Sequence, residues 1–264
     1  MSLLYNKLIK SIKTAIYESL FDDIDDIVTD NDNVSIIGDR LRGNYKFVNL
    51  GLPSGTLWCT KNLGAKTETD PGDYYQWGYT EPVKKGTTLL TKADYTKFNP
   101  SGDNKTFTKY NKNNVHYQLE NIDDAAQQET YGFFRIPTPE QWQELVQCCR
   151  WKLVNINGVN VYRITSKKRK YKDQLYLPQG GIIKNSKEGN YFATIYCGRN
   201  YDKTCGFYWT SYNASDPYFD NSKAYADCFY FGKGLDIYEC RPQIINDMPR
   251  FFALNIRPVY NFNN

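Results

Sequence analysis

The stretch Val48–Pro82 reads VNLGLPSGTLWCTKNLGAKTETDPGDYYQWGYTEP and carries the strongest fold signal in the chain. It opens with a turn rich in Gly and Pro, continues into a short aromatic run around Trp58, and ends in a second aromatic run that contains Trp77. Short aromatic runs separated by Gly and Pro predict strands joined by tight turns. The stretch therefore predicts a unit of short, irregular strands.

Four further motifs follow along the chain: Phe134–Val146 (FRIPTPEQWQELV), Arg150–Lys167 (RWKLVNINGVNVYRITSK), Leu175–Gly181 (LYLPQGG) with Gly206–Ser211 (GFYWTS), and Ala253–Val259 (ALNIRPV). With the first stretch, they resemble in order the landmarks of the Fibrobacter succinogenes major paralogous domain. The resemblance spans Tyr45–Tyr260. It implies an α+β domain of C-type lectin-like fold, with irregular antiparallel sheets and two helices. It also implies a binding scaffold from Bacteroidetes-type bacteria or their phages.

The composition is that of a folded protein with many aromatic residues. Of 264 residues, 41% are apolar and 23% charged, while aromatic residues reach 16% and include 23 tyrosines. Tyrosine combines a large apolar ring with a polar tip, which suits recognition surfaces. Irregular β-rich cores also use many aromatic residues, so the composition alone leaves both interpretations open.

The N-terminus predicts an amphipathic helix over Leu3–Phe21, because apolar residues recur on one side and lysines lie largely on the other. This helix would precede the domain. Its stripe must be buried, either against the domain or as an anchor on another subunit or a second copy, and we favour the anchor. The stripe consists of Leu4, Leu8, Ile9, Ile12, Ile16 and Leu20.

An acid-rich connector from Asp22 to Asp32 follows this helix. It lacks the central Gly and the closing Glu of an EF-hand loop, so it is interpreted as a solvated linker. Val34–Ile37 predicts a short strand. We therefore expect an anchor and linker over residues 1–44 and the lectin-like domain over residues 45–264. Lysines interrupt Met1–Leu20, which argues against a signal peptide, and no run of about 18 apolar residues predicts a membrane span.

Local signals place several elements within the domain. Thr138 and Gln141 form a T-x-x-Q capping box that predicts a helix over Pro139–Cys149. Asn121–Tyr131 predicts a second, weaker helix. The sequence NINGV at Asn155–Val159 predicts a hairpin turn between two strands, because Asn-Gly accommodates positive φ.

Other landmark residues are assigned to the framework. We expect Trp58, Tyr75, Trp77, Trp142 and Trp209 to lie in the core. Arg135 and Arg257 are expected to tie loops together through charge-assisted hydrogen bonds to backbone carbonyls.

Two segments stand out by their polarity. Val83–Gln118 is long and rich in Thr, Lys and Asn, and predicts an insertion loop, where function is often located. Lys167–Lys172 is strongly basic, and it has two interpretations: a site for a polyanion or a solvated hairpin tip. We favour the hairpin tip because no nucleic-acid-binding signature accompanies it.

No arrangement of residues predicts a catalytic or metal centre. His116 is the only histidine, and the seven cysteines include no C-x-x-C pair. The calcium-binding E-P-N motif of lectins is absent, since Val83 follows Glu81 and Pro82, and Trp209–Ser211 stands in place of a W-N-D strand. We therefore expect no cofactor and no metal, with the cysteines as buried free thiols. Calcium-free sugar binding remains open.

The resemblance implies a ligand face built from irregular loops of the second half. On this chain these are Tyr191–Tyr201, Tyr212–Phe219 and Tyr225–Tyr238. Tyr rings stack on sugar C–H faces, and Asn amides pair with hydroxyls, so a glycan is the expected ligand, although a solvated surface without a ligand is the alternative. The candidate contacts are Tyr196, Asn200, Tyr201, Tyr212, Asn213, Tyr218 and Tyr230.

These features predict a non-enzymatic phage virion protein, a head or tail fibre or decoration subunit that attaches to a host-surface glycan or protein. We expect a homotrimer on the virion surface, assembled in the host cytoplasm and bound to other virion proteins through the N-terminal helix. Nucleic acid is not an expected partner. The alternatives are a bacterial cell-surface or secreted carbohydrate-binding protein and a relative of the formylglycine-generating enzymes.

The interpretation of the cysteines as free thiols gives a first prediction. Alkylation of the denatured, non-reduced protein should label most of its seven cysteines, because a cytoplasmic assembly route keeps thiols reduced. Intact-mass spectrometry counts the labels. Protection of three pairs would indicate an exported protein and favour the bacterial-surface alternative.

Overall fold

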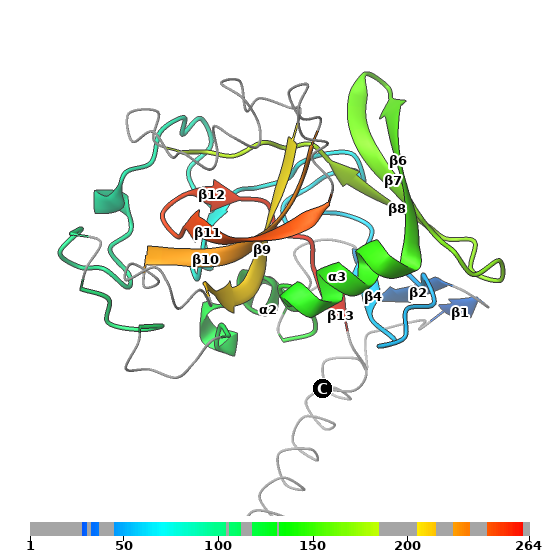
Figure 1. Cartoon of the computed structure of the whole chain (residues 1–264), viewed down its shortest axis with the longest axis horizontal. Coiled ribbons are helices and arrows are strands. Elements are labelled where there is room, and N and C mark those ends of the chain that lie inside the picture. The colour runs from blue at the N-terminus through cyan, green and yellow to red at the C-terminus, as the bar shows by residue number, and fades with distance from the viewer. Residues whose placement is uncertain are drawn as a thin grey trace, which may run out of the picture.

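The computed structural model describes residues 28–30, 33–36, 45–103, 106–111, 118–130, 132–184, 205–214, 224–232 and 242–260. Within them, named strands pair antiparallel in four sheets, accompanied by two α-helices, which makes the chain loosely α+β (Figure 1). The first sheet has the order β1-β2-β3-β4-β13. Its strands are β1 (Val28–Asp30), β2 (Asn33–Ile36), β3 (Tyr45–Val48), β4 (Leu57–Cys59) and β13 (Val259–Tyr260).

The central sheet has the order β11-β10-β9, and its strands β9 and β10 are buried on both faces. Its strands are β9 (Cys205–Asn213), β10 (Tyr225–Gly232) and β11 (Gln243–Pro249). Phe207 and Trp209 belong to one hydrophobic cluster, while Tyr208, between them, belongs to the other. Successive side chains of a strand point to opposite faces, so the sheet separates two cores.

The two cores are covered by different elements. On one face, helix α3 (Pro139–Cys148) and the sheet β6-β7-β8 cover the cluster that contains Trp142, which stacks on Phe229 with ring centroids 4.1 Å apart. On the other face lie helix α2 (Ala125–Glu129), the small sheet of β5 (Tyr75–Gln76) with β12 (Ala253–Leu254), and the segment after β5. Figure 1 shows α3 lying across the central sheet.

The third sheet contains the expected hairpin. β6 (Cys149–Ile156), β7 (Val159–Ser166) and β8 (Gln174–Pro178) form a meander whose β6–β7 hairpin projects from the body (Figure 1). Asn157 and Gly158 have φ values of 50° and 85°. Positive φ at both turn residues is what a two-residue type I′ turn requires, so the Asn-Gly prediction is confirmed.

The helix signals are also confirmed. The Thr138 hydroxyl accepts from the backbone N–H of Gln141 at 3.3 Å, and the Gln141 side-chain oxygen accepts from the backbone N–H of Thr138 at 2.9 Å. The predicted helix over Asn121–Tyr131 is split into a 3₁₀ turn, η2 (Asn121–Asp123), and α2, because Asp124 has an extended conformation and caps α2.

The five aromatic landmarks are buried as expected: Trp58, Tyr75, Trp77, Trp142 and Trp209 are all 0% exposed. Arg257 also behaves as predicted, since its two terminal nitrogens donate to the carbonyls of Cys59 and Tyr176 at 2.8 and 2.7 Å. Arg135 does not. Its backbone pairs with Val259, and its side chain makes no hydrogen bond to a carbonyl of the described residues.

Burial is also the common property of most described cysteines. Cys59, Cys149, Cys205 and Cys228 are buried, and burial raises the pKa of the Cys59 thiol to about 11 and of the Cys149 thiol to about 12. Thiols with such pKa values are poor nucleophiles at neutral pH. They act as small hydrophobic side chains.

The expected domain boundary at residue 45 cuts through the first sheet. β2 pairs with β3, with Ile36 opposite Tyr45 and Ser35 opposite Lys46, and β1 pairs with β2. The predicted strand Val34–Ile37 overlaps β2 (Asn33–Ile36), and β2 pairs with the domain instead of lying in the linker. The predicted amphipathic helix and its stripe (Leu4, Leu8, Ile9, Ile12, Ile16 and Leu20) lie outside the described residues. No helix of the described part is long and apolar enough to cross a membrane.

This pairing predicts different outcomes for two truncations. Deletion of residues 1–26 should keep the melting temperature and abolish self-association, because it removes the proposed anchor and retains β1 and β2. Deletion of residues 1–40 should also lower the melting temperature, because β3 loses its neighbour β2. Thermal unfolding and light scattering measure the two effects. If the variant that lacks residues 1–26 still forms oligomers, the helix is not the anchor. If the two truncated variants have equal melting temperatures, β1 and β2 do not contribute to stability.

Candidate ligand-binding surface

Two strands of the central sheet offer almost no surface to a ligand. Every residue of β9 is buried except the half-buried Tyr212, and every residue of β10 is buried except the half-buried Tyr225. The segments that connect the strands are therefore the candidate ligand contacts of β9 and β10. In the sequence these are residues 185–204, 215–223 and 233–241, which the structure does not describe.

The register of β9 and β10 separates these segments. Cys205 lies opposite Gly232, so segments 185–204 and 233–241 join the hairpin at one end. Asn213 lies opposite Ala226, so segment 215–223 joins it at the other end. At about 3.3 Å per residue, the nine residues of β9 separate these ends by roughly 25 Å. The three segments are thus attached at two ends of the sheet.

The structure describes only some of the predicted ligand contacts. Tyr196, Asn200, Tyr201 and Tyr218 lie outside the described residues. Tyr212 is half-buried at the end of β9, where its backbone forms a bridge with Gln118 and burial raises its pKa. Asn213 follows it and is buried, with a side-chain oxygen that makes no hydrogen bond in the described part of the chain.

Tyr230 is the one candidate that the structure removes. Its side chain is 0% exposed, and its ring packs against Phe207 at a centroid distance of 4.9 Å. The alternation along β10 points it into the core, so it is a framework residue. The sequence signal was misleading because a buried strand with both faces covered has the same aromatic composition as a recognition loop.

The strand at Trp209–Ser211, considered for calcium binding, is also part of the framework. The Trp209 indole N–H donates to the carbonyl of Tyr75 at 2.6 Å, and the Thr210 hydroxyl donates to the carbonyl of Asp227 at 3.0 Å. Ser211 is buried. Among the described residues, no group of three or more His, Cys, Asp or Glu side chains could hold a metal ion.

The insertion Val83–Gln118 differs from its predicted polar loop. Its described residues lack sheet structure apart from a bridge at Gln118 and include one 3₁₀ turn, η1 (Lys92–Asp94), yet they contribute a row of side chains to the core. The Tyr95 hydroxyl donates to the carbonyl of Trp77 at 2.6 Å. The aromatic residues scattered through this polar sequence were the signal that could have indicated its burial. The buried set is Leu90, Tyr95, Phe98, Phe107 and Tyr110.

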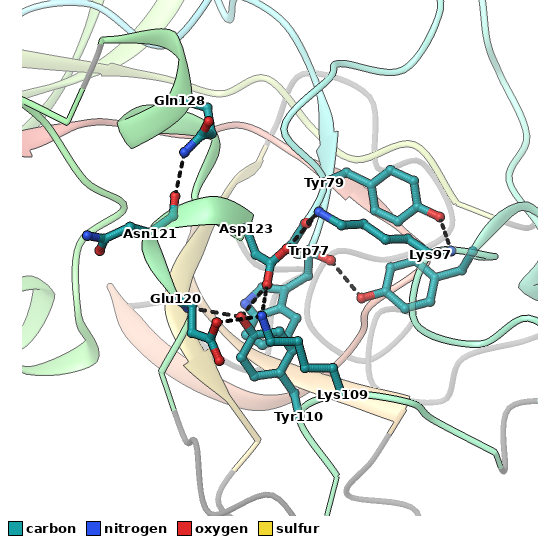
Figure 2. A network of polar contacts seen from close by, with 11 residues as sticks. Trp77, Tyr79, Lys97, Lys109, Tyr110, Glu120, Asn121, Asp123 and Gln128 are labelled. Atoms are coloured by element: carbon teal, nitrogen blue, oxygen red, sulfur yellow. Dashed lines mark hydrogen bonds and ion pairs between the residues drawn. The ribbon is translucent and has the colours of Figure 1, made fainter.

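One carboxylate fastens this insertion to η2 (Figure 2). The Asp123 side chain is 5% exposed and receives Lys97 at 2.8 Å, Lys109 at 2.5 Å and the Tyr110 hydroxyl at 2.6 Å. Lys109 also contacts Glu120 at 2.8 Å. Figure 2 shows the two lysines and the tyrosine converging on Asp123. Sequence analysis missed this network, because its three donors precede Asp123 by 13 to 26 residues without a spacing motif.

The electrostatics of this network favour ionised, paired groups. Burial opposes ionisation of Asp123, but the hydrogen bonds from Lys109, Lys97 and Tyr110 outweigh it and lower the carboxyl pKa. Burial works against the charge on Lys109, but its hydrogen bonds to Asp123 and Glu120 raise the pKa of this lysine. Both groups are charged at neutral pH, far from the poised pKa of a general acid or base. The network is a structural clamp.

Asp124, the next residue, is a buried carboxylate that belongs to the framework. Burial raises the pKa of Asp124 to about 6, while backbone hydrogen bonds oppose the shift. Its two oxygens accept from the backbone N–H groups of Gln127 at 3.1 Å and Ile136 at 2.9 Å. Asp124 is therefore occupied as the cap of α2, and no substrate proton lies within its reach in this fully buried position.

Arg250 is fully buried, as is Arg257, and no sequence motif indicated its role. Its guanidinium lies over the Trp77 ring at 4.7 Å and donates to the carbonyls of Tyr225 and Tyr110, each at 2.9 Å. Burial lowers its pKa to about 10, which leaves it charged at neutral pH. Arg250 therefore links the insertion, β5 and the start of β10.

The Asp123 network gives a prediction with a matched control. Asp123→Asn should lower the free energy of unfolding by about 2 kcal/mol at pH 7, because it leaves two partly exposed lysines without their shared carboxylate. Glu120→Gln, at the exposed end of the same network, should cost only about 0.5 kcal/mol. Urea unfolding measures both.

The pH dependence of the free energy of unfolding follows from the lowered pKa of Asp123. The pKa of Asp123 is lower in the folded chain, so its stabilisation is present above about pH 4 and is lost as the pH falls through the folded-state pKa. The difference in the free energy of unfolding between wild type and Asp123→Asn should therefore shrink in acid. Protonation of Asp124 affects both proteins equally and cancels in this difference. A difference unchanged between pH 7 and pH 3 would contradict the assignment.

No protein-family model, no curated protein and no solved structure matches this chain. The function is therefore argued from the residues themselves.

Proposed function

We propose that this chain is a non-enzymatic phage virion protein, a head or tail fibre or decoration subunit whose lectin-like domain attaches to a host-surface glycan. The motifs of the first half and the order of the later landmarks support the lectin-like assignment. The amphipathic N-terminal stripe supports assembly, as a homotrimer, on other virion proteins.

The observation that carries the proposal is the enclosure of strands β9 and β10. The side chains of β9 and β10 are buried in two cores, so the two strands form a rigid support for the segments attached to them. Those segments are rich in residues suited to sugar recognition, since they contain Tyr191, Tyr196, Tyr201, Tyr218 and Tyr238. Recognition residues on loops held by a rigid scaffold are the usual arrangement of binding domains.

The described ionisable groups also favour binding over catalysis. Asp123 is held by two lysines, Asp124 caps a helix, and Arg250 and Arg257 are bound to backbone carbonyls. Each serves the framework. Cys205 is fully buried, with its sulfur 3.9 Å from the Tyr230 hydroxyl oxygen.

The two ends of the central sheet can be tested separately for attachment. We expect the variant with Tyr196→Ala and Tyr201→Ala, at the Cys205 end, to lose at least about tenfold in affinity for host cells or purified capsule, because stacking rings supply much of the energy of sugar binding. Tyr218→Ala tests the opposite end. Pull-down of labelled protein on cells measures binding, and thermal unfolding checks that each variant remains folded.

A Leu89→Ala variant is the control, because Leu89 is 44% exposed and belongs to the insertion. Wild-type attachment by both folded tyrosine variants would exclude these ends as the binding surface. Wild-type protein that binds no host cell and no capsule would refute the proposed function.

A further inference from the structure

The sheet β6-β7-β8 has one face on the core and one face outward. On the inner face, Trp151 and Tyr162 pack against Phe231, with ring centroids 6.2 and 5.0 Å apart, and Ile164 is fully buried. Because side chains alternate along a strand, the residues between these point to the outer face. The outer face thus carries Arg150 and Lys152 from β6, Arg163 and Thr165 from β7, and Gln174 and Tyr176 from β8. It is covered in the next row, where Val161 and Pro178 are buried.

This part of the chain is strongly and uniformly basic. Residues 145–172 contain no Asp or Glu, and their positive charge exceeds the net charge of +4 of the whole chain. The basic loop after β7 continues from one end of the same sheet, on the side of the molecule where this sheet protrudes (Figure 1). The cations are Arg150, Lys152, Arg163, Lys167, Lys168, Arg169, Lys170 and Lys172.

Some of these cations serve the framework. The Lys167 ammonium donates to the carbonyl of Gln147 at the end of α3, the Lys168 ammonium donates to the carbonyl of Gly51 at 2.6 Å, and Arg150 donates to the carbonyl of Ser166 at 3.1 Å. Lys152 and Arg163 have no such role. Neither forms an ion pair with any residue that the structure describes.

Lys152 and Arg163 are directly opposite each other on neighbouring strands. Directly opposed side chains have their Cβ atoms about 5 Å apart, and like charges in this arrangement destabilise a sheet. A carboxylate placed between them would replace this repulsion by two charge-assisted hydrogen-bonded contacts, one of them to a guanidinium, which matches carboxylate geometry.

An aromatic ring lies beside this cation pair. Tyr176 is directly opposite Arg163 on β8, so Lys152, Arg163 and Tyr176 form one row across the three strands. Tyr176 is held on both sides, because its carbonyl accepts from Arg257 at 2.7 Å and its hydroxyl donates to Gln174 at 2.7 Å. The row therefore combines two cations and one fixed half-buried ring, and the Gln174 amide lies in the neighbouring row.

We infer that the outer face of β6-β7-β8 binds an acidic polysaccharide, with a uronate carboxylate between Lys152 and Arg163 and the sugar ring against Tyr176. This inference rests on the proposed function and names the chemical class of its glycan. A single-stranded nucleic acid would be bound through several rings on which bases stack, whereas this face carries one ring.

The test uses the full chain and polygalacturonate, a polymer of uronic acid, with dextran as the neutral polymer. The protein should bind polygalacturonate and not dextran, and added salt should weaken the binding. The double variant Lys152→Gln with Arg163→Gln should lose affinity by roughly tenfold, as expected for two partly exposed charged contacts. Biolayer interferometry on the immobilised polymers measures the affinities.

The matched control is Lys84→Gln with Lys85→Gln, which removes the same charge from two exposed lysines of the insertion and should leave the affinity within about twofold. Equal losses in the two double variants would overturn the site, because binding would then follow net charge alone. Tighter binding of oligo-dT than of polygalacturonate would also overturn it.

The inference and the proposed function can fail separately. Attachment to host cells that the Lys152 and Arg163 variant leaves unchanged would refute the acidic-polysaccharide site and leave the proposed function standing. Failure of the wild-type protein to bind host cells or either polymer would refute both.

Discussion

The burial of β9 and β10 on both faces of the central sheet is the constraint on which the rest of the fold depends. A sheet with one solvated face needs a single covering layer, but β9 places Trp209 on one side and Tyr208 on the other, both fully buried. Each side therefore needs its own cover. Helix α3 and the sheet β6-β7-β8 provide one, and the irregular insertion with α2, β5 and β12 provides the other.

The irregular cover creates a second requirement, because backbone carbonyls outside regular ladders still need hydrogen-bond donors. Long side chains supply them. The hydroxyl of Tyr95 donates to the carbonyl of Trp77, the amide of Gln76 to that of Phe251, and the guanidinium of Arg250 to that of Tyr110. Two fully buried arginines are tolerated in this core because they replace the missing donors of a sheet.

Sequence reasoning succeeded where the signal was local. The capping box of Thr138 and Gln141 and the positive-φ turn at Asn157 and Gly158 each depend on residues a few positions apart, and the structure contains both. It failed where the deciding contact was distant along the chain. Tyr230 was mistaken for a surface residue, because only its pairing across the sheet with Phe207 reveals that it points into a core.

The same limit applies to the candidate sites. The three tyrosine-rich segments are attached at two ends of the sheet, which only the register of β9 and β10 reveals. The Asp123 clamp combines donors from an insertion whose path follows no periodic pattern. The basic composition of residues 145–172 was visible in sequence, but strand register was needed to place Lys152, Arg163 and Tyr176 in one row.

The sheet β6-β7-β8 packs against one end of the central sheet. Phe231 lies opposite Gly206 and beside the Cys205–Gly232 pair, and the same Phe231 ring packs against Tyr162 on the inner face of β7. The sheet with the basic outer face is thus fastened next to the end that carries segments 185–204 and 233–241. The opposite end, with Asn213 and segment 215–223, is separated from it by the length of β9.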